Sequence, residues 1–292
     1  MPEYDVILTN PCGETGETVE KSLVSKGLNV KVITGPSARK TEAWYLKTLK
    51  AAVEESGARM IIPIFFQDVL SAHRDEFPGI IIPLDDAAKI RLLDNKISAC
   101  ALADELGIPQ PHIYKDIHDV ERFPVVFKRP GGQGGDSVYF PRTPKALEYL
   151  YRNTTETIVQ DYIDGDNYCV DALRWDGFFF ATVYKVLLPK GKGVSILRES
   201  VEDPELVGMV KKLLDHVDYH GVCGVDFIRE SSTGDPFFLE CNPRFSGGLE
   251  SAIASGFDLP YVYWCLASGY PVPEDAVSFR SGVLTGKAAP KE

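Results

Sequence analysis

The sequence lacks the features of a membrane-bound, exported or nucleic-acid-binding protein. No apolar run approaches the roughly 20 residues that a membrane-spanning helix needs. The N-terminus, MPEYDVILTN, holds no basic segment followed by an apolar one, so no signal peptide is expected. The net charge of −11 has the wrong sign for a surface that binds polyanionic nucleic acid. We therefore expect a soluble, cytoplasmic protein that has neither a membrane nor a nucleic acid as a partner.

Paired cysteines and the usual nucleophile sets are also missing. The 6 cysteines are scattered without a Cys-x-x-Cys pair, which argues against zinc and disulfides and fits a reducing compartment. No Ser–His–Asp or Cys–His set is evident. The segment GPSARKT at 35–41 lacks the glycine before the lysine of a Walker A motif, so we interpret it as a loop leading into a helix.

Residues 1–94 alternate between strand-like and helix-like segments. Strands are predicted at Tyr4–Thr9, Val30–Thr34, Met60–Phe65 and Ile80–Ile82, and helices at Gly16–Lys26, Ala38–Glu55 and Gln67–Asp75. This order indicates right-handed crossovers and a small parallel sheet. The turn at Asn10–Gly16 opens a helix after a strand, as phosphate-binding turns do. It has no basic residue, so a structural turn is favoured and substrate contact is the alternative.

A helix is predicted at Ile97–Leu106, ending at Gly107 with prolines soon after. Lys96 lies at its start, where the helix dipole disfavours a cation. If Lys96 is exposed to solvent, this unfavourable position has little consequence. The other interpretation is that Lys96 binds an anion.

A glycine-rich loop links two predicted strands, Phe123–Lys128 and Ser137–Phe140. Its sequence, RPGGQGGD, places Gly131, Gly132, Gly134 and Gly135 directly after Lys128 and Arg129. Glycines let backbone N–H groups approach an anion closely. A flexible hairpin tip is the plain interpretation, but the two adjacent cations favour a flap over phosphates.

The second half of the chain begins with β-rich segments and ends with helices. Strands are predicted at 157–163, Tyr168–Trp175 and Phe178–Lys185, and helices at Pro204–His216 and Ala252–Gly269, the last interrupted at Gly256–Pro260.

Between these helices, a hairpin with arms Val222–Ile228 and Pro236–Asn242 carries the strongest chemical signal. Asp226 lies about as far before the turn as Glu240 lies after it, so the two are expected side by side on one face. Strict alternation places Phe238, Glu240 and Asn242 on that face, and Phe237, Leu239 and Cys241 on the other. We expect Cys241 in the core. Two carboxylates beside an amide oxygen suit Mg²⁺, which also takes substrate phosphates as ligands.

The ordered set of a lysine strand, a glycine-rich hairpin, the segment VQDYI and the segments DFI and FLECNPRFSGG resembles the ATP-grasp superfamily. This resemblance implies an ATP-grasp fold of mixed α/β and α+β class, with ATP gripped between antiparallel sheets. Residues 1–94 would form a parallel pre-ATP-grasp domain, 95–155 a small lid subdomain, and 156–292 the large subdomain with the metal-binding and catalytic residues.

The resemblance also implies roles for individual residues. Lys96 and Lys128 would contact ATP phosphates, the loop Gly131–Gly135 would close over them, and Asp226, Glu240 and Asn242 would hold Mg²⁺ or Mn²⁺. Adenine would be held mostly through the backbone of Gln160, Asp161, Tyr162 and Ile163, and ribose by Asn167. Gln160 and Asn167 depart from the acids usual at these positions, but an amide still hydrogen-bonds adenine or a ribose hydroxyl.

The implied activity is an ATP-dependent carboxylate–amine ligase that forms an amide or peptide bond through an acyl phosphate. Arg244, Lys128 and Arg198 are its expected catalytic residues. Arg198, Lys185 and the turn Ser246–Gly248 are placed to meet a substrate carboxylate or phosphate, with Arg198 favoured because a bidentate guanidinium suits a carboxylate. An ordinary surface arginine is the alternative interpretation of Arg198. The partners are a small-molecule carboxylate and amine, and a homodimer is compatible with this function. Alternatives are a non-catalytic ATP-binding module and a biotin-carboxylase or carbamoyl-phosphate type of activity.

Overall fold

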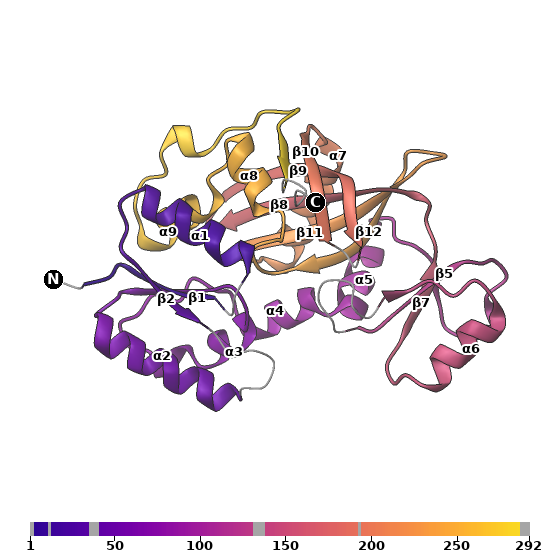
Figure 1. The fold of residues 1–292 in the computed structure, drawn as a ribbon, viewed down its shortest axis with the longest axis horizontal. Helices are drawn as coiled ribbons and strands as arrows, with labels where there is room; N and C mark the ends of the chain where they lie inside the picture. The colour runs from indigo at the N-terminus through magenta and orange to yellow at the C-terminus, as the bar shows by residue number, and fades with distance from the viewer. Residues whose placement is uncertain (1–2, 11–12, 35–40, 131–137, 192–193, 287–292) are drawn as a thin grey trace, which may run out of the picture.

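The computed structural model describes residues 3–10, 13–34, 41–130, 138–191 and 194–286, which form three separate β-sheets (Figure 1). In Figure 1 the N-terminal sheet lies at lower left, the largest sheet above the centre, and the smallest sheet at right. Helices α4 (Ala87–Asp94) and α5 (Lys96–Glu105) run between the outer two, beneath the large sheet. The mixed α/β and α+β class expected from the sequence is confirmed.

The N-terminal sheet is parallel, as the alternation predicts. Its order is β2-β1-β3. Its elements are β1 (Val6–Asn10), α1 (Glu14–Ser25), β2 (Val30–Thr34), α2 (Glu42–Ser56), β3 (Met60–Pro63), α3 (Gln67–Ala72) and the 3-10 turn η1 (Arg74–Glu76). The helix predicted from Ala38 begins at Glu42, capped by the Thr41 side chain, and residues 35–40 lie outside the described part.

The predicted strand at Ile80–Ile82 is wrong. Only an isolated bridge joins Ile81 to Met60, with Ile81 donating to Arg59 O and accepting from Ile61 N. Pro83 follows at once and has no N–H with which to continue a ladder. Helix α4, which the sequence interpretation left unassigned, begins shortly afterwards.

The large sheet is antiparallel, in the order β12-β11-β8-β9-β10-β13. Its strands are β8 (Gly165–Trp175), β9 (Phe178–Gly191), β10 (Val194–Val201), β11 (Gly221–Glu230), β12 (Pro236–Asn242) and β13 (Leu284–Gly286). One face, with Val170 and Val225, packs on α4, α5 and α7 (Pro204–Val217). The other face, with Leu173 and Val222, packs on α1, α8 (Leu249–Ser255) and α9 (Leu259–Ser268); the 3-10 turn η3 (Glu274–Ala276) follows α9.

The small sheet has the order β4-β7-β5-β6 and is covered by α6 (Pro144–Arg152). Its strands are β4 (Ile113–Tyr114), β5 (Val125–Lys128), β6 (Val138–Tyr139) and β7 (Ile158–Asp161), with the 3-10 turn η2 (Ile117–Asp119) between β4 and β5. Val125, Phe127, Leu147 and Val159 form its core. This sheet carries Lys128 at the end of β5 and Gln160 on β7.

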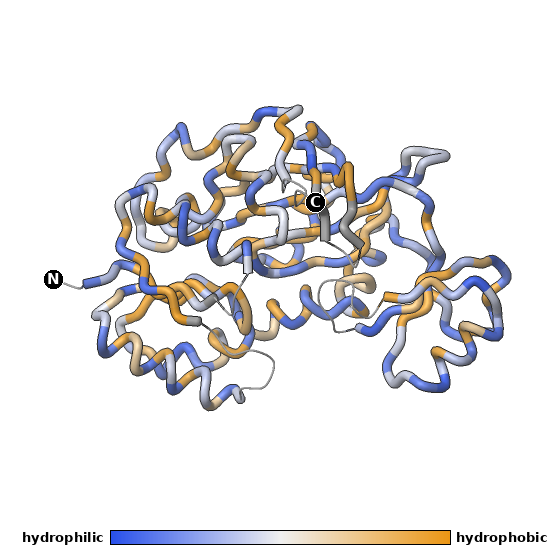
Figure 2. The backbone as a smooth tube through the Cα atoms, viewed as in Figure 1, coloured by the Kyte–Doolittle hydropathy of each residue, from blue (hydrophilic) through white to orange (hydrophobic). Residues whose placement is uncertain are grey.

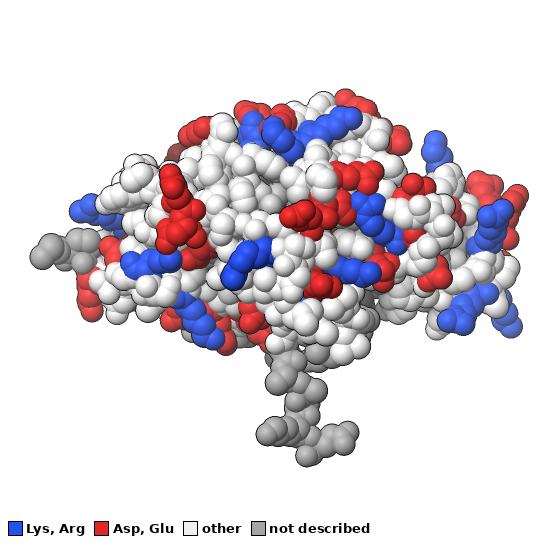
Figure 3. Space-filling model, turned by 90° about the horizontal axis from the view of Figure 1, so that it is seen from above, with Lys and Arg blue, Asp and Glu red and all other residues white. Residues whose placement is uncertain are grey.

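Hydrophobic residues follow the strands of the sheets, whereas the outer helices alternate between hydrophobic and hydrophilic positions (Figure 2). On the face seen in Figure 3, acidic and basic side chains are interspersed and do not gather into one patch of a single sign. Among the described helices, none combines the length and the apolar character that crossing a bilayer demands.

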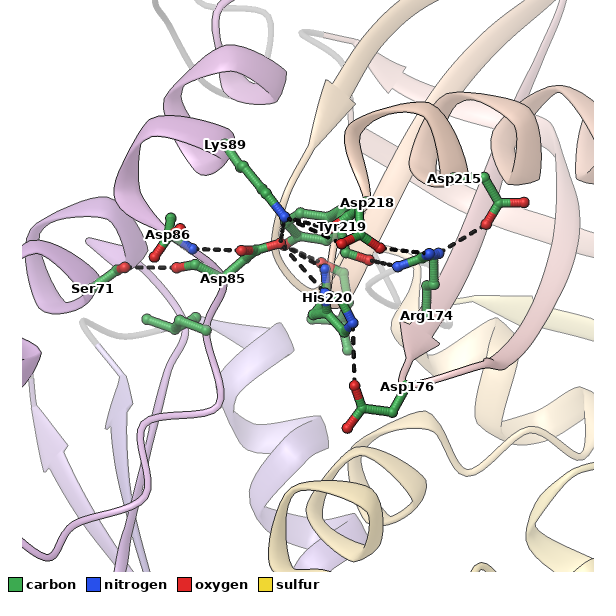
Figure 4. A network of polar contacts seen from close by, with 12 residues as sticks. Ser71, Asp85, Asp86, Lys89, Arg174, Asp176, Asp215, Asp218, Tyr219 and His220 are labelled. Atoms are coloured by element: carbon green, nitrogen blue, oxygen red, sulfur yellow. Dashed lines mark hydrogen bonds and ion pairs between the residues drawn. The ribbon is translucent and has the colours of Figure 1, made fainter.

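A polar network joins the segment before α4 to the large sheet (Figure 4). Buried Asp85 accepts from the backbone N–H of His220 at 2.7 Å, and its Oδ2 lies 3.3 Å from the Lys89 ammonium. Next to it, Arg174 at the end of β8 donates at 2.8–2.9 Å to Asp215, Asp218 and the carbonyl of Tyr219. The N-terminal part is thereby tied to the loop that enters β11.

Replacing Asp85 with alanine is expected to lower the free energy of unfolding by about 1–3 kcal/mol, because a buried N–H and an ammonium lose their acceptor. Urea denaturation measures this. Asp86→Ala is the matched control: its side chain is exposed and caps nothing, so a change within about 0.5 kcal/mol is expected. Equal losses in the two variants would contradict a structural role for the network.

Candidate active site

The carboxylates of the β11–β12 hairpin lie side by side. Asp226 pairs directly with Glu240 across the two strands, which confirms the arrangement predicted from their distances to the turn. Asn242 follows two residues later on the same strand, and its Nδ2 donates to Asp226 Oδ2 at 3.4 Å and to Glu240 Oε1 at 3.3 Å. The three side chains predicted to converge do converge.

A β-bulge at Leu239 corrects the predicted faces of β12. Phe227 pairs with Phe238, whereas the preceding residue Asp226 pairs with Glu240, so Leu239 is an extra residue on β12. An extra residue shifts the alternation of side chains by one position. Phe238 therefore lies in the core together with Cys241, and its predicted place on the face of Glu240 and Asn242 is wrong. The core position of Cys241 is confirmed.

Two buried lysines approach Glu240 from different elements. Lys96, the first residue of α5, places its Nζ 2.9 Å from Glu240 Oε2. Lys128, at the end of β5, donates to the carbonyl of the bulge residue Leu239 at 3.5 Å. Only 8% of Lys96 and 6% of Lys128 is exposed, so both cations are largely withdrawn from water. The structure thus brings together Lys96, Lys128 and the acid pair from three sequence-distant segments.

Burial and proximity shift the ionisation of this cluster. Burial raises the pKa of Asp226 to about 7, and the neighbouring Glu240 carboxylate acts in the same direction. Burial also raises the pKa of Glu240, but Lys96, Asn242 and Lys128 outweigh it, so the net pKa is lowered. Burial lowers the pKa of Lys128, and the charge of Lys96 adds to this effect. One carboxylate is therefore compensated by the lysines and the other is not.

Arg244 is held from two sides just after β12. Its Nη2 donates to Asn242 Oδ1 at 2.7 Å, and its Nη1 donates to Asp94 Oδ1 at 2.8 Å. The sequence interpretation missed Asp94, which lies at the end of α4, 150 residues away in the chain. The only local signal was its position next to Asn95 and Lys96.

The donor set fits a hard divalent cation in chemistry, with one adjustment. Asp226, Glu240 and Asn242 offer the oxygen ligands that Mg²⁺ prefers. However, the amide nitrogen of Asn242 faces the acids and its oxygen faces Arg244, so the amide must turn before its oxygen can be a ligand. In the described part of the chain, no cluster of three or more His, Cys, Asp and Glu residues is suited to holding a metal ion.

Arg198 lies apart from the acid pair, beside the predicted turn. Its Nη2 donates to Gly247 O at 3.2 Å and its guanidinium lies 5.7 Å from the centre of the Tyr184 ring. Thr15 Oγ1 in the first turn of α1 donates to Ser246 O at 3.3 Å. Together they border a pocket, here called the arginine pocket, lined by Glu14, Thr15, Thr18, Arg198, Gly247, Leu249 and Glu250. Lys185 is not part of it; its Nζ lies 2.6 Å from Asp166.

Asp171 is a second residue that the sequence interpretation missed. It is 1% exposed, and neither of its carboxylate oxygens has a hydrogen-bond partner. Asp171 pairs with Gly224 of β11 and therefore lies on the same face of the sheet as Gly224. Asp226 is two residues beyond Gly224 on that strand, so Asp171 and Asp226 face the same side. Burial raises the pKa of Asp171 to about 7; the nearby Ser246 side chain, although not in full hydrogen-bonding geometry, and the charge of Arg198 partly oppose this shift. An acid inside the apolar run Cys-Val-Asp-Ala-Leu was its signal in the sequence.

The residues expected at the adenine lie around β7. Gln160 is buried, Asp161 accepts from the Tyr114 hydroxyl at 2.6 Å, and the ring of Tyr162 packs edge-on against Phe140. Ile163 follows, and Asn167 is an exposed residue of β8. The loop residues Gly131, Gly132, Gly134 and Gly135 lie outside the described residues.

A small antiparallel sheet with a buried lysine, a large antiparallel sheet with paired acids, and a parallel N-terminal sheet together form the ATP-grasp fold, which the solved neighbours below share. Residues 153–287 match the model of a family described as ATP-grasp in the biosynthetic pathway with Ter operon.

Individual relatives are distant. D-alanine--D-alanine ligase of Fusobacterium nucleatum is 24% identical over 153 residues, 48% of this chain and 53% of that one. The chain spans about half the length of the curated relatives it matches. Two solved structures share the fold across most of the chain. The biotin carboxylase domain of 2-oxoglutarate carboxylase from Hydrogenobacter thermophilus, with MgADP and bicarbonate, has TM-score 0.77 at 16% identity, covering 96% of this chain and 73% of that one. L-amino acid ligase from Bacillus licheniformis has TM-score 0.72 at 14% identity, covering 96% of this chain and 78% of that one.

Replacing Asp226 with asparagine is expected to stabilise the metal-free protein at pH 8 by about 1–3 kcal/mol, with little effect at pH 4. An unfolded aspartate has a pKa of about 3.9, whereas that of folded Asp226 is about 7. The contribution of Asp226 to stability is therefore greatest at pH values below the pKa of the unfolded aspartate, and it is lost as the pH rises through the folded pKa of about 7. Urea denaturation with a chelator at both pH values measures this. Asp235→Asn, on the exposed turn of the same hairpin, is the control; a pH-independent effect of Asp226→Asn would contradict the assignment.

Proposed function

We propose that this chain is an ATP- and Mg²⁺-dependent ligase that joins a small-molecule carboxylate to an amine through an acyl phosphate. The observation that carries the proposal is the convergence of the acid pair Asp226 and Glu240 with Lys96, Lys128 and Arg244. The matches to a D-alanine--D-alanine ligase and an L-amino acid ligase support ligation, and the MgADP-bound neighbour supports the cofactors.

Each residue of the cluster has a separate task in this function. Asp226, Glu240 and Asn242 would hold Mg²⁺ or Mn²⁺, which supplies charge to the phosphate oxygens during transfer. Lys96 and Lys128 offset the repulsion between the triphosphate and an incoming carboxylate. Because Lys96 and Lys128 are buried, little solvent screens their charges, so their attraction for the phosphates is stronger than it would be in water. Arg244 would face the transferred phosphoryl group.

The nucleotide would lie between the two antiparallel sheets. Gln160, Asp161, Tyr162 and Ile163 would hold adenine, and Asn167 the ribose. The loop Gly131–Gly135 would cover the phosphates and exclude water from the acyl phosphate. The division into 1–94, 95–155 and 156–292, a homodimeric state and a cytoplasmic location stay predictions.

The arginine pocket is proposed as one side of the substrate site, and its charges favour an amino acid. A guanidinium suits a carboxylate, and the pocket also holds two acids, Glu14 and Glu250, that suit an ammonium group. A substrate with both groups would be complementary to both kinds of charge. This proposal agrees with substrate contact by the turn at Asn10–Gly16, which is the alternative to the structural turn that the sequence favours.

A second candidate is a carboxylase or carbamoyl-phosphate type of activity, favoured by the bicarbonate-bound neighbour and by a match to a carbamoyl-phosphate synthase. A non-catalytic ATP-binding module is the third. Lys96 contacts Glu240, while Lys128 and Arg244 contact the neighbouring residues Leu239 and Asn242 of the same segment. This gathering of cations around the acid pair argues for chemistry over binding alone.

Phosphate release from Mg·ATP should be stimulated by an amino acid together with an amine or second amino acid. Replacing Glu240 with glutamine should reduce this turnover by at least about 100-fold, because a metal ligand and charge are lost while the shape is kept. Glu230→Gln, farther along the same hairpin, should retain activity.

Three outcomes separate the candidate functions. Stimulation by bicarbonate without an amine would favour the carboxylase type of activity. ATP binding by calorimetry without turnover on any substrate panel would favour the binding module. Full activity of Glu240→Gln would remove the metal assignment.

Replacing Arg198 with lysine should raise the KM for the amino acid by about 10- to 100-fold and leave the KM for ATP unchanged, because the bidentate contact is lost. Glu250→Gln should abolish the preference for an amino acid over its deaminated analogue. Steady-state kinetics measures both, with Arg152→Lys on the exposed end of α6 as control. An unchanged preference in both Glu14→Gln and Glu250→Gln would contradict ammonium recognition.

A further inference from the structure

Two charged residues at the α4–α5 junction, Asp94 and Lys96, stand in locally unfavourable positions. Asp94 is the last residue of α4, where the helix dipole is negative, and Lys96 is the first residue of α5, where it is positive. Exchanging the two charges would suit both helices better. Local conflicts of this kind are expected where a residue serves a site.

Both conflicts are compensated by the same short segment of the large sheet. Lys96 contacts Glu240 at 2.9 Å, and Asp94 contacts Arg244 at 2.8 Å. The residue between them, Asn95, caps α5 by accepting from the backbone N–H groups of Ile97 and Ser98, which fixes the junction. The junction therefore holds the segment Glu240–Arg244 at both ends.

Arg244 donates to Asp94 and to Asn242, and only Asn242 is also a proposed metal ligand. Asn242 Oδ1 accepts from Arg244 at 2.7 Å in this structure, but the proposed function requires that oxygen at the metal. An amide oxygen turned toward the acid pair turns its N–H₂ group toward the guanidinium, and two donors do not bond. Of the two side chains holding Arg244, only Asp94 has no such second task.

We propose that Asp94 is a positioning residue that keeps the Arg244 guanidinium directed at the transferred phosphoryl group when the metal is bound. This inference rests on the proposed function. Asp94 is joined to Nη1, so Nη2, once Asn242 has turned its oxygen to the metal, can donate to an anion while Asp94 keeps its hold on the guanidinium. Fixed orientation of a cation before charge develops is what lowers the barrier in such sites.

The test uses binding of Mg·ADP alone and of Mg·ADP with aluminium fluoride, a mimic of the transferred phosphoryl group, measured by calorimetry on the full chain. Asp94→Asn should bind Mg·ADP within about two-fold of the parent protein and bind the aluminium fluoride complex about 10-fold more weakly, the equivalent of about 1.4 kcal/mol. Asp94→Glu should restore most of the loss. Asp68→Asn, which breaks the exposed contact between Asp68 and Arg91 of α4, is the matched control and should change neither affinity.

A double variant with Arg244→Lys completes the test. If Asp94 acts through Arg244, adding Asp94→Asn to Arg244→Lys should weaken binding by less than about two-fold further. Unchanged aluminium fluoride affinity in Asp94→Asn, together with a loss in Arg244→Lys, would overturn the positioning role alone. Failure of the parent protein to bind Mg·ADP would instead overturn the proposed function, and this inference with it.

Discussion

Two carboxylates placed side by side on paired strands repel each other, and the rest of the site is arranged to compensate this repulsion. Asp226 and Glu240 face each other across β11 and β12. α5 contributes Lys96, β5 contributes Lys128, and the segment directly after β12 contributes Arg244. The compensation is uneven, because the lysines lower the pKa of Glu240 while that of Asp226 stays raised. A bound cation would stabilise the ionised form of the uncompensated carboxylate, and this is the physical basis for expecting a metal here.

The candidate site was predictable where its residues are close in sequence or follow strand periodicity. The pairing of Asp226 with Glu240 follows from their equal distances to one turn, and the position of Lys96 was marked by its conflict with the helix dipole. The bulge at Leu239 was not predictable, because Phe237, Phe238 and Leu239 are all hydrophobic and fit either face. Asp94 was missed because its partner Arg244 is distant in the chain, and a charged residue at a helix end looks like an ordinary solvated one.

The fold was predictable to a similar degree. The parallel order of β1, β2 and β3 followed from alternating strands and helices. Ile80–Ile82 was overpredicted because β-branched residues favour strands, yet nothing in the propensity of Ile81 reveals that Pro83 prevents a longer ladder. α4 was missed because the helix has only 8 residues and its buried apolar residues, Ile90 and Leu93, lie within a single turn. Its position was set instead by tertiary contacts such as those of Asp85.

The strand that carries Glu240 and Asn242 is also the last strand of the six-stranded sheet. A free sheet edge can recruit a strand from another molecule and so lead to aggregation. Here the N–H of Phe238 is already used by the carbonyl of Pro109, at 2.8 Å, in the linker that follows α5. Because proline has no N–H to return, the linker covers the edge without becoming a strand itself. Loosening of that linker would expose the sheet edge next to the acid pair, so the residues that cover this edge protect the same strand that carries Glu240.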